Sequence, residues 1–350
     1  PNPRVGCIIT KDDTIIAEGW HERAGEPHAE INALKHLTAE QSSGATAYVT
    51  LEPCSHIGRT PPCSQALIKA GIKRVVVAMQ DPNPLVAGKG LQQLREAGIE
   101  TASGLMESTS RDLNPGFIKR MEQGLPWVSV KLAMSLDGRT AMASGESKWI
   151  TSEAARKDVQ FLRAKASAIL TGQGTVLTDD PSLNVRLDAD DLNITGDIRQ
   201  PIRVVLDPEL KMSPDALMLD LSGKTLIIST DNHSSQSKPL INQGAEILTL
   251  ASTSLSTLPL RETLKTLAKQ EINEIHVEAG ATLCGALIQE GLVDELIIYM
   301  APTLMGSEAR GLLNLPGLEH MKDKINLEIT DIRAIGSDWR IIARPQNTNH

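Results

Sequence analysis

The chain has 350 residues, of which 43 are acidic and 35 are basic, so its formal net charge is −8. This acidic balance and an aromatic content of only 2% argue against a nucleic-acid-binding surface, which combines many Lys and Arg side chains with aromatic rings on which bases stack. No apolar run approaches the roughly 20 residues of a membrane span, and the four cysteines are too few and too scattered for a secreted disulfide framework, so we expect a cytoplasmic protein without membrane contacts.

The first part of the chain alternates short β runs with helical stretches, which predicts an α/β domain. Its strands are expected at residues 5–10, 14–20, 45–51 and 73–79, and its helices at 27–37 and 63–71. Because the chain opens almost directly on a strand and without a methionine, we expect an N-terminal element to be missing. A polar, glycine-bearing passage at 114–126 ends in a proline before a new β run, as is typical of a domain boundary. We therefore expect one domain over residues 1–123 and a second over 124–350.

The second part again alternates strands with helices. We expect strands at 127–135, 167–171, 201–207, 225–230, 275–279 and 294–300, and helices at 152–165, 259–269 and 281–290, the first of these capped by Ser152. The polar stretches 188–200 and 231–243 are interpreted as surface loops. Such alternation predicts a largely parallel or mixed sheet covered by helices.

Three side chains in the first domain have the chemistry of metal ligands. His28 follows a proline at a predicted helix start, Cys63 opens the next predicted helix, and Cys54 ends a predicted strand. A thiolate at a helix N-terminus is stabilised by the helix dipole, as a metal-bound cysteine requires. One His and two Cys leave the fourth position of a tetrahedral zinc ion open to water, which is the arrangement of a catalytic site. Glu30, two residues after the histidine, is then free to transfer protons.

These residues form the H-x-E and P-C parts of the zinc-deaminase signature. By itself H-x-E occurs often by chance, and the two cysteines could be core thiols. The combination favours the metal site. In deaminases that act on nucleic acids two residues separate the cysteines, whereas eight separate them here, and this insertion carries His56 and Arg59, which could hold a phosphate.

The second domain lacks a standard dinucleotide fingerprint, because the sequence at 172–177 has no third glycine. Glycine-containing turns nevertheless follow the predicted strands at 167–171 and 275–279, and the second of them opens a helix. Either turn could approach a pyrophosphate, although a tight turn without a ligand explains each of them about equally well.

Longer stretches carry a family resemblance. These are PNPRVGC (1–7), GEPHAEINAL (25–34), TAYVTLEPCSHIGRTPPC (46–63), MQDPNPLVAGKG (79–90), SLDGRTAMASGESKWI (135–150), ILTGQGTVLTDDPSLNVR (169–186) and VEAGATLCGALI (277–288). In order and almost end to end, the chain resembles the bifunctional riboflavin-biosynthesis family that joins a diaminohydroxyphosphoribosylaminopyrimidine deaminase to a 5-amino-6-(5-phosphoribosylamino)uracil reductase. The resemblance implies a cytidine-deaminase-like zinc domain followed by a dihydrofolate-reductase-like α/β domain that uses NADPH.

The resemblance also implies roles for particular residues. It makes Glu30 the proton donor and His28, Cys54 and Cys63 the ligands of one Zn²⁺. Contacts to NADPH are implied for Ala133, Trp149, Thr175, Asp179, Gly280, Ala281, Thr282, Leu283, Cys284, Gly285 and Ala286. Contacts to a phosphorylated pyrimidine substrate are implied for Asn2, Ser147, Arg163, Leu183, Arg186 and Glu278, where Asn2 could equally be a turn residue and Arg163 a solvated helix charge. Pro208 stands where the family usually has Ser or Thr, which puts a cofactor contact there in doubt. We also expect a homo-oligomer.

Two other interpretations remain. The chain could be a zinc-dependent nucleoside or RNA deaminase with a non-catalytic C-terminal domain, which the acidic charge, the scarcity of aromatics and the cysteine spacing disfavour. Alternatively, one half could have decayed into a structural domain, against which the complete set of metal ligands argues.

Overall fold

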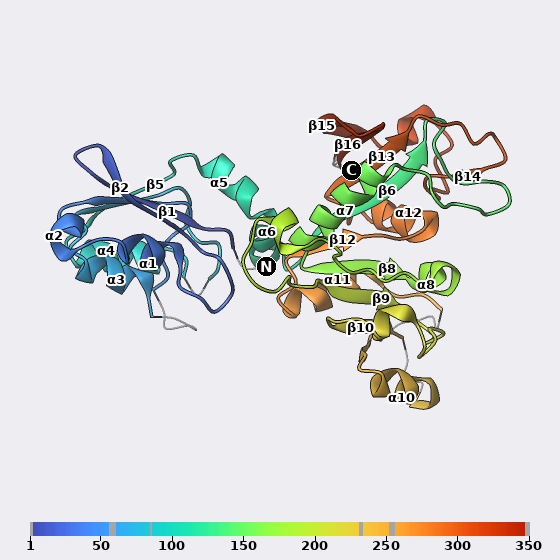
Figure 1. Cartoon of the computed structure of the whole chain (residues 1–350), viewed down its shortest axis with the longest axis horizontal. Helices are drawn as coiled ribbons and strands as arrows, with labels where there is room; N and C mark the ends of the chain where they lie inside the picture. The colour runs from blue at the N-terminus through green and yellow to red at the C-terminus, as the bar shows by residue number, and fades with distance from the viewer. Residues whose placement is uncertain (1–2, 56–60, 85, 231–233, 252–255, 347–350) are drawn as a thin grey trace. The chain divides into compact units, whose positions relative to one another are not determined.

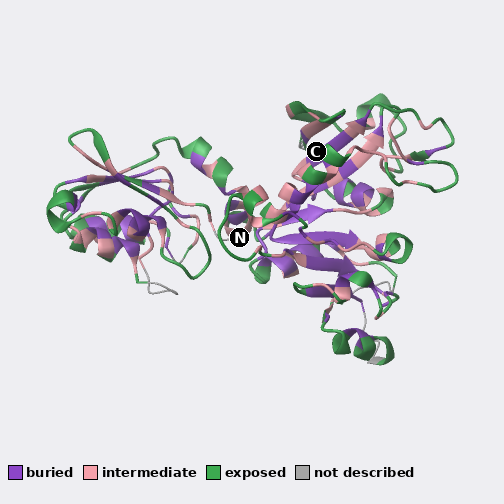
Figure 2. Cartoon of the chain, in the orientation of Figure 1, coloured by how far each residue is buried: buried purple, intermediate pink, exposed green. Residues whose placement is uncertain are grey.

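The computed structural model describes residues 3–55, 61–84, 86–230, 234–251 and 256–346. The chain divides into two compact units, Pro1–Leu125 and Pro126–His350, each of which is considered by itself (Figure 1). Buried residues concentrate in the central strands, such as Ala168–Gly172, Ile202–Leu206 and Thr225–Ser229, whereas the strand Leu327–Ile335 is largely exposed (Figure 2). No helix in these described ranges is long and apolar enough to cross a membrane.

The N-terminal unit is built on a five-stranded sheet with the strand order β2-β1-β3-β4-β5. Its strands are β1 (Gly6–Lys11), β2 (Thr14–Trp20), β3 (Thr46–Val49), β4 (Arg74–Val77) and β5 (Glu100–Ser103). Strand β1 runs antiparallel to both of its neighbours, and β3, β4 and β5 are parallel. The helices are α1 (Ala29–Leu34), α2 (Ala39–Ser42), α3 (Cys63–Lys69), α4 (Lys89–Glu96), α5 (Glu107–Leu113) and α6 (Pro115–Gln123). Residues of α1, α3 and α4 pack with the inner face of the sheet in one apolar core.

One prediction for this unit was wrong in detail, because the helix expected over 27–37 ends at Leu34. The passage at 114–126, for which no helix was predicted, is largely helical, as α6. Pro115 suits the first turn of a helix and Gly124, with φ 68°, ends it in the left-handed conformation. Phe117 and Ile118 of α6 are buried in a small apolar cluster, which stabilises a helix that composition alone disfavours.

The C-terminal unit contains a nine-stranded mixed sheet with the order β11-β10-β9-β8-β12-β6-β13-β16-β15. Its strands are β6 (Trp127–Ser135), β8 (Ala168–Gly172), β9 (Ile202–Leu206), β10 (Thr225–Ser229), β11 (Glu246–Thr249), β12 (Glu274–Val277), β13 (Glu295–Ala301), β15 (Leu327–Ile335) and β16 (Asp338–Pro345). Strand β16 is antiparallel to β13 and β15, and the other neighbours are parallel. Strands β7 (Arg139–Ala141) and β14 (Arg310–Gly311) form a separate pair.

The helices of this unit are α7 (Glu153–Lys165), α8 (Gln173–Asp179), α9 (Ala189–Leu192), α10 (Ser234–Asn242), α11 (Leu260–Lys269) and α12 (Ala281–Gln289), with short 3-10 turns η1 (Leu217–Leu219) and η2 (Met321–Asp323). The Ser152 hydroxyl caps α7 by accepting a hydrogen bond from the Ala155 N–H (3.3 Å), as predicted.

Several elements of the C-terminal unit were not predicted. The expected loop at 231–243 contains α10, because Leu240 is buried in the core despite the polar composition around it. The expected loop at 188–200 contains α9, which begins with a capping box at Asp188. The glycine-containing turn after β8 continues into α8. The terminal hairpin of β15 and β16 was also missed.

Candidate active sites

The side chains of His28, Cys54 and Cys63 meet in the N-terminal unit. Their ligand atoms all lie within 4.8 Å of one another. His28 Nδ1 is 3.6 Å from Cys54 Sγ and 3.3 Å from Cys63 Sγ. In a tetrahedral zinc site with Zn–N and Zn–S bonds of usual length, a nitrogen and a sulfur ligand are about 3.6 Å apart. The donor set and its spacing therefore fit a zinc ion.

His28 is positioned by the start of α1. It is the N-cap residue, and Asn32 of the same helix fixes the turn before it by donating hydrogen bonds to the Pro27 carbonyl (3.2 Å) and the Trp20 carbonyl (2.8 Å). Helix α1 lies very close to β2, because a Cβ atom at Gly19 would come within 2.4 Å of the Ala29 carbonyl oxygen. A larger residue at position 19 would push the histidine away from the sheet.

The two cysteines are held against each other by the start of α3. Cys63 is the first residue of that helix, as predicted, and its N–H donates to Cys54 Sγ (3.3 Å). The next residue, Ser64, donates its N–H to the Cys54 carbonyl (3.2 Å). Backbone donation to a sulfur favours its thiolate form, which is the form that binds metal.

Cys54 does not end a strand, contrary to the prediction. Strand β3 stops at Val49, and the segment that carries Cys54 is held instead by the buried carboxylate of Glu52. This carboxylate accepts four backbone N–H groups, from Asp81 (3.2 Å), Gly88 (2.9 Å), Gly90 (3.0 Å) and Leu91 (3.2 Å). Sequence reasoning missed Glu52, although a charged residue between an apolar strand and Pro53 was a usable signal.

The thiols ionise unequally without a metal. The hydrogen bond from Cys63 lowers the pKa of the Cys54 thiol to about 4. The pKa of Cys63 is raised, because its proton is held by Cys54 and because the group is buried. The hydrogen bond with Cys54 raises the pKa of His28. A dication would allow both sulfurs to be thiolates, since its charge offsets their repulsion.

Glu30 lies on the first turn of α1, beside the metal ligands. It is 3% exposed, and burial raises the pKa of its carboxyl group. Cys63 contributes a hydrogen bond to the same carboxyl group. A buried carboxyl whose pKa is raised above its usual value holds a proton more readily, which suits a general acid and base. Of the other expectations for this domain, Asn2, His56 and Arg59 lie outside the described residues.

In the C-terminal unit, Arg163 and Glu278 form a buried ion pair. Arg163 Nε and Nη2 donate to the two carboxylate oxygens of Glu278 at 2.6 and 3.0 Å, and Nη1 donates to the Asn184 carbonyl (2.9 Å). Arg163 is 8% exposed, so it is not the solvated helix charge that its position on α7 allowed. Burial by itself would raise the pKa of Glu278, but the Arg163 charge and a hydrogen bond from His276 hold it well below its usual range.

Lys131 of β6 faces this ion pair and was not predicted. Burial lowers the pKa of its amine, and the charges of Glu278 and Arg163 also act on it. It lies in the strand that also carries Ala133, two residues further along and therefore on the same face of the sheet. An amine within an apolar β run, at the position after Val130, was the signal in the sequence.

Leu183 and Arg186 lie in the segment that passes Arg163. Leu183 is buried with φ 44°, a left-handed conformation that is strained for a leucine, and this turn directs the next carbonyl, of Asn184, to Arg163. Arg186 is exposed, and its Nη1 donates to the Ser182 hydroxyl (2.8 Å). Burial and the Arg163 charge lower the pKa of Arg186, so the two guanidinium groups interact.

The residues expected to contact NADPH lie mainly near the carboxyl ends of parallel strands. Thr175 and Asp179 are on α8, directly after β8, and residues 280–286 form the start of α12, after β12. Gly280 and Thr282 are exposed, whereas Cys284 and Gly285 are buried. A Cβ atom at Gly285 would come within 1.9 Å of the Asn314 carbonyl oxygen, so close packing explains this glycine.

The remaining expected contacts lie before α7 and after β9. Trp149 is 72% exposed and its ring stacks against the Arg156 guanidinium (4.7 Å), while Ser147 is half-buried. The Pro208 carbonyl accepts hydrogen bonds from the N–H (3.1 Å) and the hydroxyl (3.0 Å) of Thr230. A hydroxyl therefore lies beside Pro208, although residue 208 cannot supply one.

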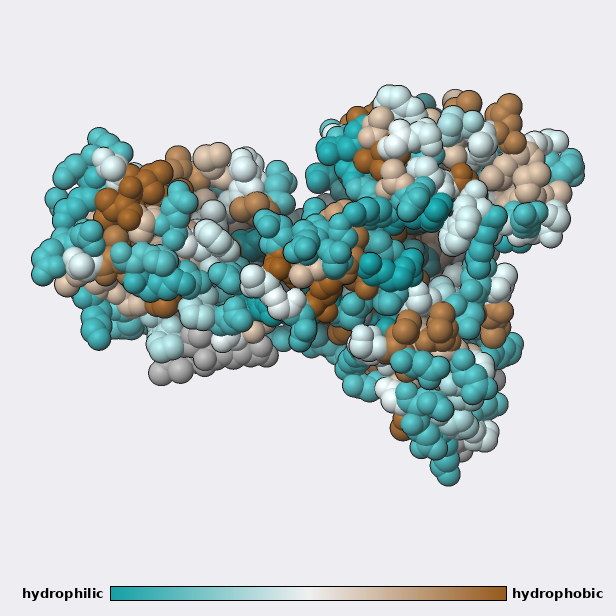
Figure 3. All heavy atoms as spheres, in the orientation of Figure 1, coloured by the Kyte–Doolittle hydropathy of each residue, from teal (hydrophilic) through white to brown (hydrophobic). Residues whose placement is uncertain are grey.

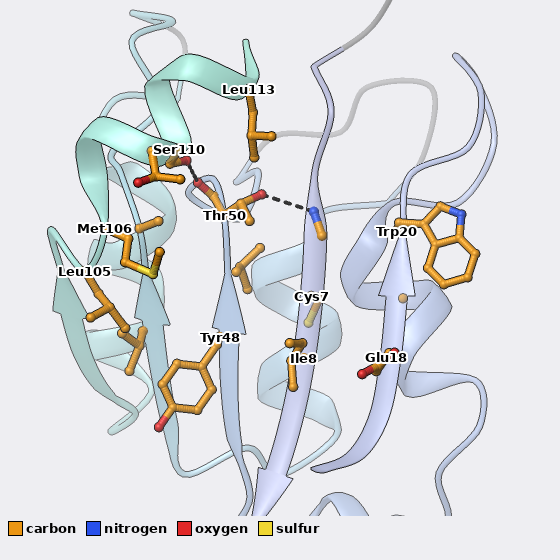
Figure 4. Close-up of a pocket in the computed structure, with 16 residues that line it drawn as sticks. Cys7, Ile8, Glu18, Trp20, Tyr48, Thr50, Leu105, Met106, Ser110 and Leu113 are labelled. Atoms are coloured by element: carbon orange, nitrogen blue, oxygen red, sulfur yellow. Dashed lines mark hydrogen bonds between the residues drawn. The ribbon is translucent and has the colours of Figure 1, made fainter.

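A groove of about 430 Å³ lies on the outer face of the N-terminal sheet, beside α5 (Figure 4). Ile8 and Tyr48, which are cross-strand partners, point into it, and Leu105 and Met106 line its far side. The Ser110 hydroxyl of α5 donates to the Thr50 carbonyl (2.5 Å) at one end. Hydrophilic side chains cover much of the face drawn in Figure 3, with hydrophobic patches among them, one of them on the N-terminal unit.

Comparison with known proteins accounts for both units. The family model of the cytidine and deoxycytidylate deaminase zinc-binding region matches residues 1–79, and that of the RibD C-terminal domain matches residues 126–341. The riboflavin biosynthesis protein RibD of Escherichia coli (strain K12) is 52% identical over 343 residues, which are 97% of this chain and 92% of that protein. Its counterpart in Haemophilus influenzae is 48% identical, over 99% of this chain and 92% of that protein.

Solved structures agree with these sequence comparisons. RibD of Acinetobacter baumannii (form 1) matches with a TM-score of 0.89 and 46% identity, covering 99% of this chain and 93% of that one. The diaminohydroxyphosphoribosylaminopyrimidine deaminase/5-amino-6-(5-phosphoribosylamino)uracil reductase of Thermotoga maritima matches with a TM-score of 0.82 and 31% identity, covering 99% and 93%. The expected fold, a zinc-binding deaminase domain followed by a reductase domain, is thereby confirmed, and the chain belongs to the RibD family of bifunctional riboflavin biosynthesis enzymes.

Proposed function

We propose that the chain carries out two successive reactions on one phosphorylated pyrimidine. The first is hydrolytic deamination of 2,5-diamino-6-(5-phosphoribosylamino)pyrimidin-4(3H)-one to 5-amino-6-(5-phosphoribosylamino)uracil. The second is reduction of the ribosyl chain by NADPH, which gives 5-amino-6-(5-phosphoribitylamino)uracil. The observation that carries the proposal is the cluster of His28, Cys54 and Cys63 beside the buried Glu30, in a chain whose RibD relatives match almost its whole length.

Deamination is assigned to the N-terminal unit. His28, Cys54 and Cys63 would hold a zinc ion, which would supply an activated water with a pKa of about 7. Glu30, beside these ligands, would serve as the general acid and base that moves a proton to the departing amine. The raised pKa of the Glu30 carboxyl, a result of its burial, suits both steps, because the group must hold the proton between them. A positioned acid/base group of this kind contributes about 10²- to 10⁴-fold in rate.

Reduction is assigned to the C-terminal unit. Arg186 is the exposed guanidinium near the buried pair, so we assign the ribose phosphate to it, with Ser147 and Leu183 nearby in the substrate site. Arg163 holds Glu278 ionised and in place to accept hydrogen bonds from sugar hydroxyls. The Lys131 amine lies in reach of the same pair and extends the assigned set.

NADPH is the reductant of the second reaction, and it supplies the hydride. The residues assigned to its binding are Ala133, Trp149, Thr175, Asp179 and the run Gly280 to Ala286. Within this run, Cys284 and Gly285 are assigned to maintaining the conformation of the turn. Open space beside Gly174 and Gly280 leaves their backbones accessible to a ligand. Strand ends beside helix starts are where α/β proteins bind nucleotides.

The proposal also covers the division into domains, the binding partner, self-association and the location of the enzyme. We assign deamination to a domain over residues 1–123 and reduction to one over 124–350. The partner is the phosphorylated pyrimidine and not a nucleic acid, in line with the net charge of −8 and the 2% aromatic content. The enzyme self-associates and works in the cytoplasm.

The test is to incubate the zinc-loaded enzyme with the diaminopyrimidine and NADPH and to identify the products by mass spectrometry. Wild type should give the deaminated, reduced product. Glu30→Gln should retain one zinc per chain but lose about 10²- to 10⁴-fold in deamination, and should still oxidise NADPH when the deaminated intermediate is supplied. As a control, Glu40→Gln, at an exposed position, should behave as wild type. Deamination of cytidine or tRNA, but not of this pyrimidine, would contradict the proposal.

A further inference from the structure

Strand β12 carries polar side chains on one face although it lies in the middle of the sheet. Both of its neighbours, β6 and β8, are parallel to it, and strands in such a position usually carry apolar side chains on both faces. Only one face of β12 follows this rule, with Ile275 and Val277. The other carries His276 and, directly after the strand, Glu278. His276 is 3% exposed, so its imidazole is buried inside the unit.

The strands beside His276 leave its ring to interact with Glu278. Register partners in neighbouring strands point to the same side of the sheet, and those of His276 are Ser129 on β6 and Ile169 on β8. The Ser129 hydroxyl donates to Glu295 (3.3 Å), and Ile169 is apolar. The Nε2 atom of His276 lies 3.5 Å from Oε1 of Glu278. The imidazole is thus directed at the carboxylate that Arg163 also binds.

This contact distinguishes His276 from a histidine that only fills the core. Buried polar atoms in proteins nearly always have a hydrogen-bond partner. Within the described part of the chain, His276 Nε2 is one of four buried side-chain polar atoms that lack an aligned one. Its distance of 3.5 Å to Glu278 is beyond the usual length of a hydrogen bond. In active sites such contacts are often long before the substrate binds and shorten afterwards.

The two oxygens of Glu278 differ in their contacts. Oε1 accepts a hydrogen bond from Arg163 Nε (2.6 Å) and faces His276 Nε2 (3.5 Å). Oε2 accepts from Arg163 Nη2 (3.0 Å) and from no other residue that the structure describes. A carboxylate oxygen accepts about two hydrogen bonds, so Oε1 has its full number once His276 donates, whereas Oε2 can accept one more. Because Arg163 belongs to α7 and His276 to β12, the carboxylate is held from two separate elements.

We propose that His276 is a positioning residue of the reductase site. Its Nε2–H donates to Oε1 of Glu278 and so keeps Oε2 directed at a hydroxyl group of the substrate's sugar. The inference rests on the reduction proposed above, and it adds the residue that orients Glu278 and the oxygen that binds the sugar. His276 acts through Glu278 and does not itself contact the substrate.

The effect on the kinetics follows from the kind of contact. The sugar hydroxyl is bound in the substrate as well as in the transition state, so loss of its acceptor raises KM for the pyrimidine substrate more than it lowers kcat. A hydrogen bond to a charged group corresponds to about 10- to 100-fold in kcat/KM. The KM for NADPH should not change, because Oε2 is assigned to the sugar and not to the cofactor.

The experiment compares His276→Gln with His276→Asn in the zinc-loaded full chain. NADPH oxidation is measured with the deaminated intermediate as substrate. The glutamine amide nitrogen can take the place of Nε2, whereas the asparagine amide is one methylene shorter and cannot reach Glu278. His276→Gln should keep KM for the intermediate within about threefold of wild type, and His276→Asn should raise it about 10- to 100-fold.

A packing control separates this role from a structural one. Ile169→Val removes one methyl group beside His276 and no polar atom. It should lower the melting temperature measured by circular dichroism but leave KM for the intermediate unchanged. A raised KM in Ile169→Val, equal to that of His276→Asn, would assign the effect to packing and contradict the inference.

The other outcomes are also decisive. Equal KM values for His276→Gln and His276→Asn, whether raised or not, would show that Nε2 does not act on Glu278. A wild-type chain that fails to oxidise NADPH with the intermediate would remove the proposed reduction itself, and with it the inference. An active wild type with an unaffected His276→Asn would remove the inference alone.

A measurement on the wild type decides if circular dichroism shows that His276→Asn is unfolded. The chain is labelled with ¹⁵N-histidine, and the His276 signals are assigned by their absence in His276→Gln. Nε2 should carry a proton, and its chemical shift should change when the reduced product binds. An Nε2 without a proton, or a shift that the product leaves unchanged, would contradict the inference.

Discussion

Replacing Glu52 by glutamine tests whether one buried carboxylate holds the Cys54 segment in place. The carboxylate accepts four backbone N–H groups, from Asp81, Gly88, Gly90 and Leu91, at 2.9 to 3.2 Å. The glutamine amide has one oxygen, which can accept at most two of them, and its NH₂ group would face the other donors. Two buried N–H groups would thus lose their acceptor.

The expected cost follows from those two donors. A buried donor without a partner costs about 1–3 kcal/mol, and part of this is offset because the neutral amide is easier to bury than a carboxylate. We therefore expect Glu52→Gln to destabilise the segment that carries Cys54 by about 2–4 kcal/mol. This corresponds to a rise of roughly 30- to 1,000-fold in the equilibrium constant for local opening of the segment. Zinc should also be released faster, because Glu52 is two residues from Cys54.

Hydrogen exchange measured by mass spectrometry is the suitable assay, because the amides of Gly88, Gly90 and Leu91 are themselves the donors. Loss of zinc to a chelator is the second readout. As a control, Glu96→Gln, on the exposed side of α4, should change stability by less than about 0.5 kcal/mol. Exchange rates within threefold of wild type, together with unchanged zinc retention, would refute the argument that Glu52 supports the metal site.

Two further predictions concern the C-terminal unit. Glu278→Gln leaves Arg163 buried without its counter-ion and should lower the free energy of unfolding by about 3–5 kcal/mol at pH 7. The folded-state pKa of Glu278 is depressed, so the stabilisation by this carboxylate is present above about pH 4.3 and is lost as the pH falls towards the folded-state pKa. The difference in unfolding free energy between wild type and Glu278→Gln, measured by urea unfolding, should therefore be smaller at about pH 3.5 than at pH 7. An equal difference at both pH values would contradict the pairing. Gly285→Ala should lower the free energy of unfolding by about 3 kcal/mol or more, since its Cβ would lie 1.9 Å from a carbonyl oxygen. Gly174→Ala, which has open space around its Cβ, should change it by no more than about 1 kcal/mol in thermal unfolding. Equal effects of the two substitutions would show that the backbone near Gly285 can move to accept the methyl group.

The metal cluster could be anticipated from the sequence because two of its residues stand at helix starts. Proline before His28 and before Cys63 marks those starts locally, and the structure has both. Cys54 was expected at a strand end and lies instead in a segment held by Glu52, whose four donors come from residues 29 to 39 positions away. Hydrogen bonds of that range leave no periodic signal in the sequence.

The mixed sheet of the second unit was predictable from its alternating strands and helices, but its ion pair was not. Arg163 and Glu278 are 115 residues apart, and only the parallel order of β8, β12 and β6 brings them together. The terminal hairpin escaped prediction for a different reason, since the bulge after Ile329 interrupts the alternation by which a strand is recognised. Helix α10 was missed because its burial of Leu240 outweighs a polar composition. The roles of individual site residues stay predictions.

The groove beside α5 has a practical consequence for measurements on this protein. Its volume of about 430 Å³ equals that of roughly fourteen water molecules. Side chains such as Ile8, Leu105 and Met106 offer these waters few hydrogen bonds, so an aromatic dye that displaces them gains free energy. Dyes that report unfolding by binding apolar surface should therefore already fluoresce with the folded chain. Melting followed by such a dye would start from a high baseline, and circular dichroism avoids this background.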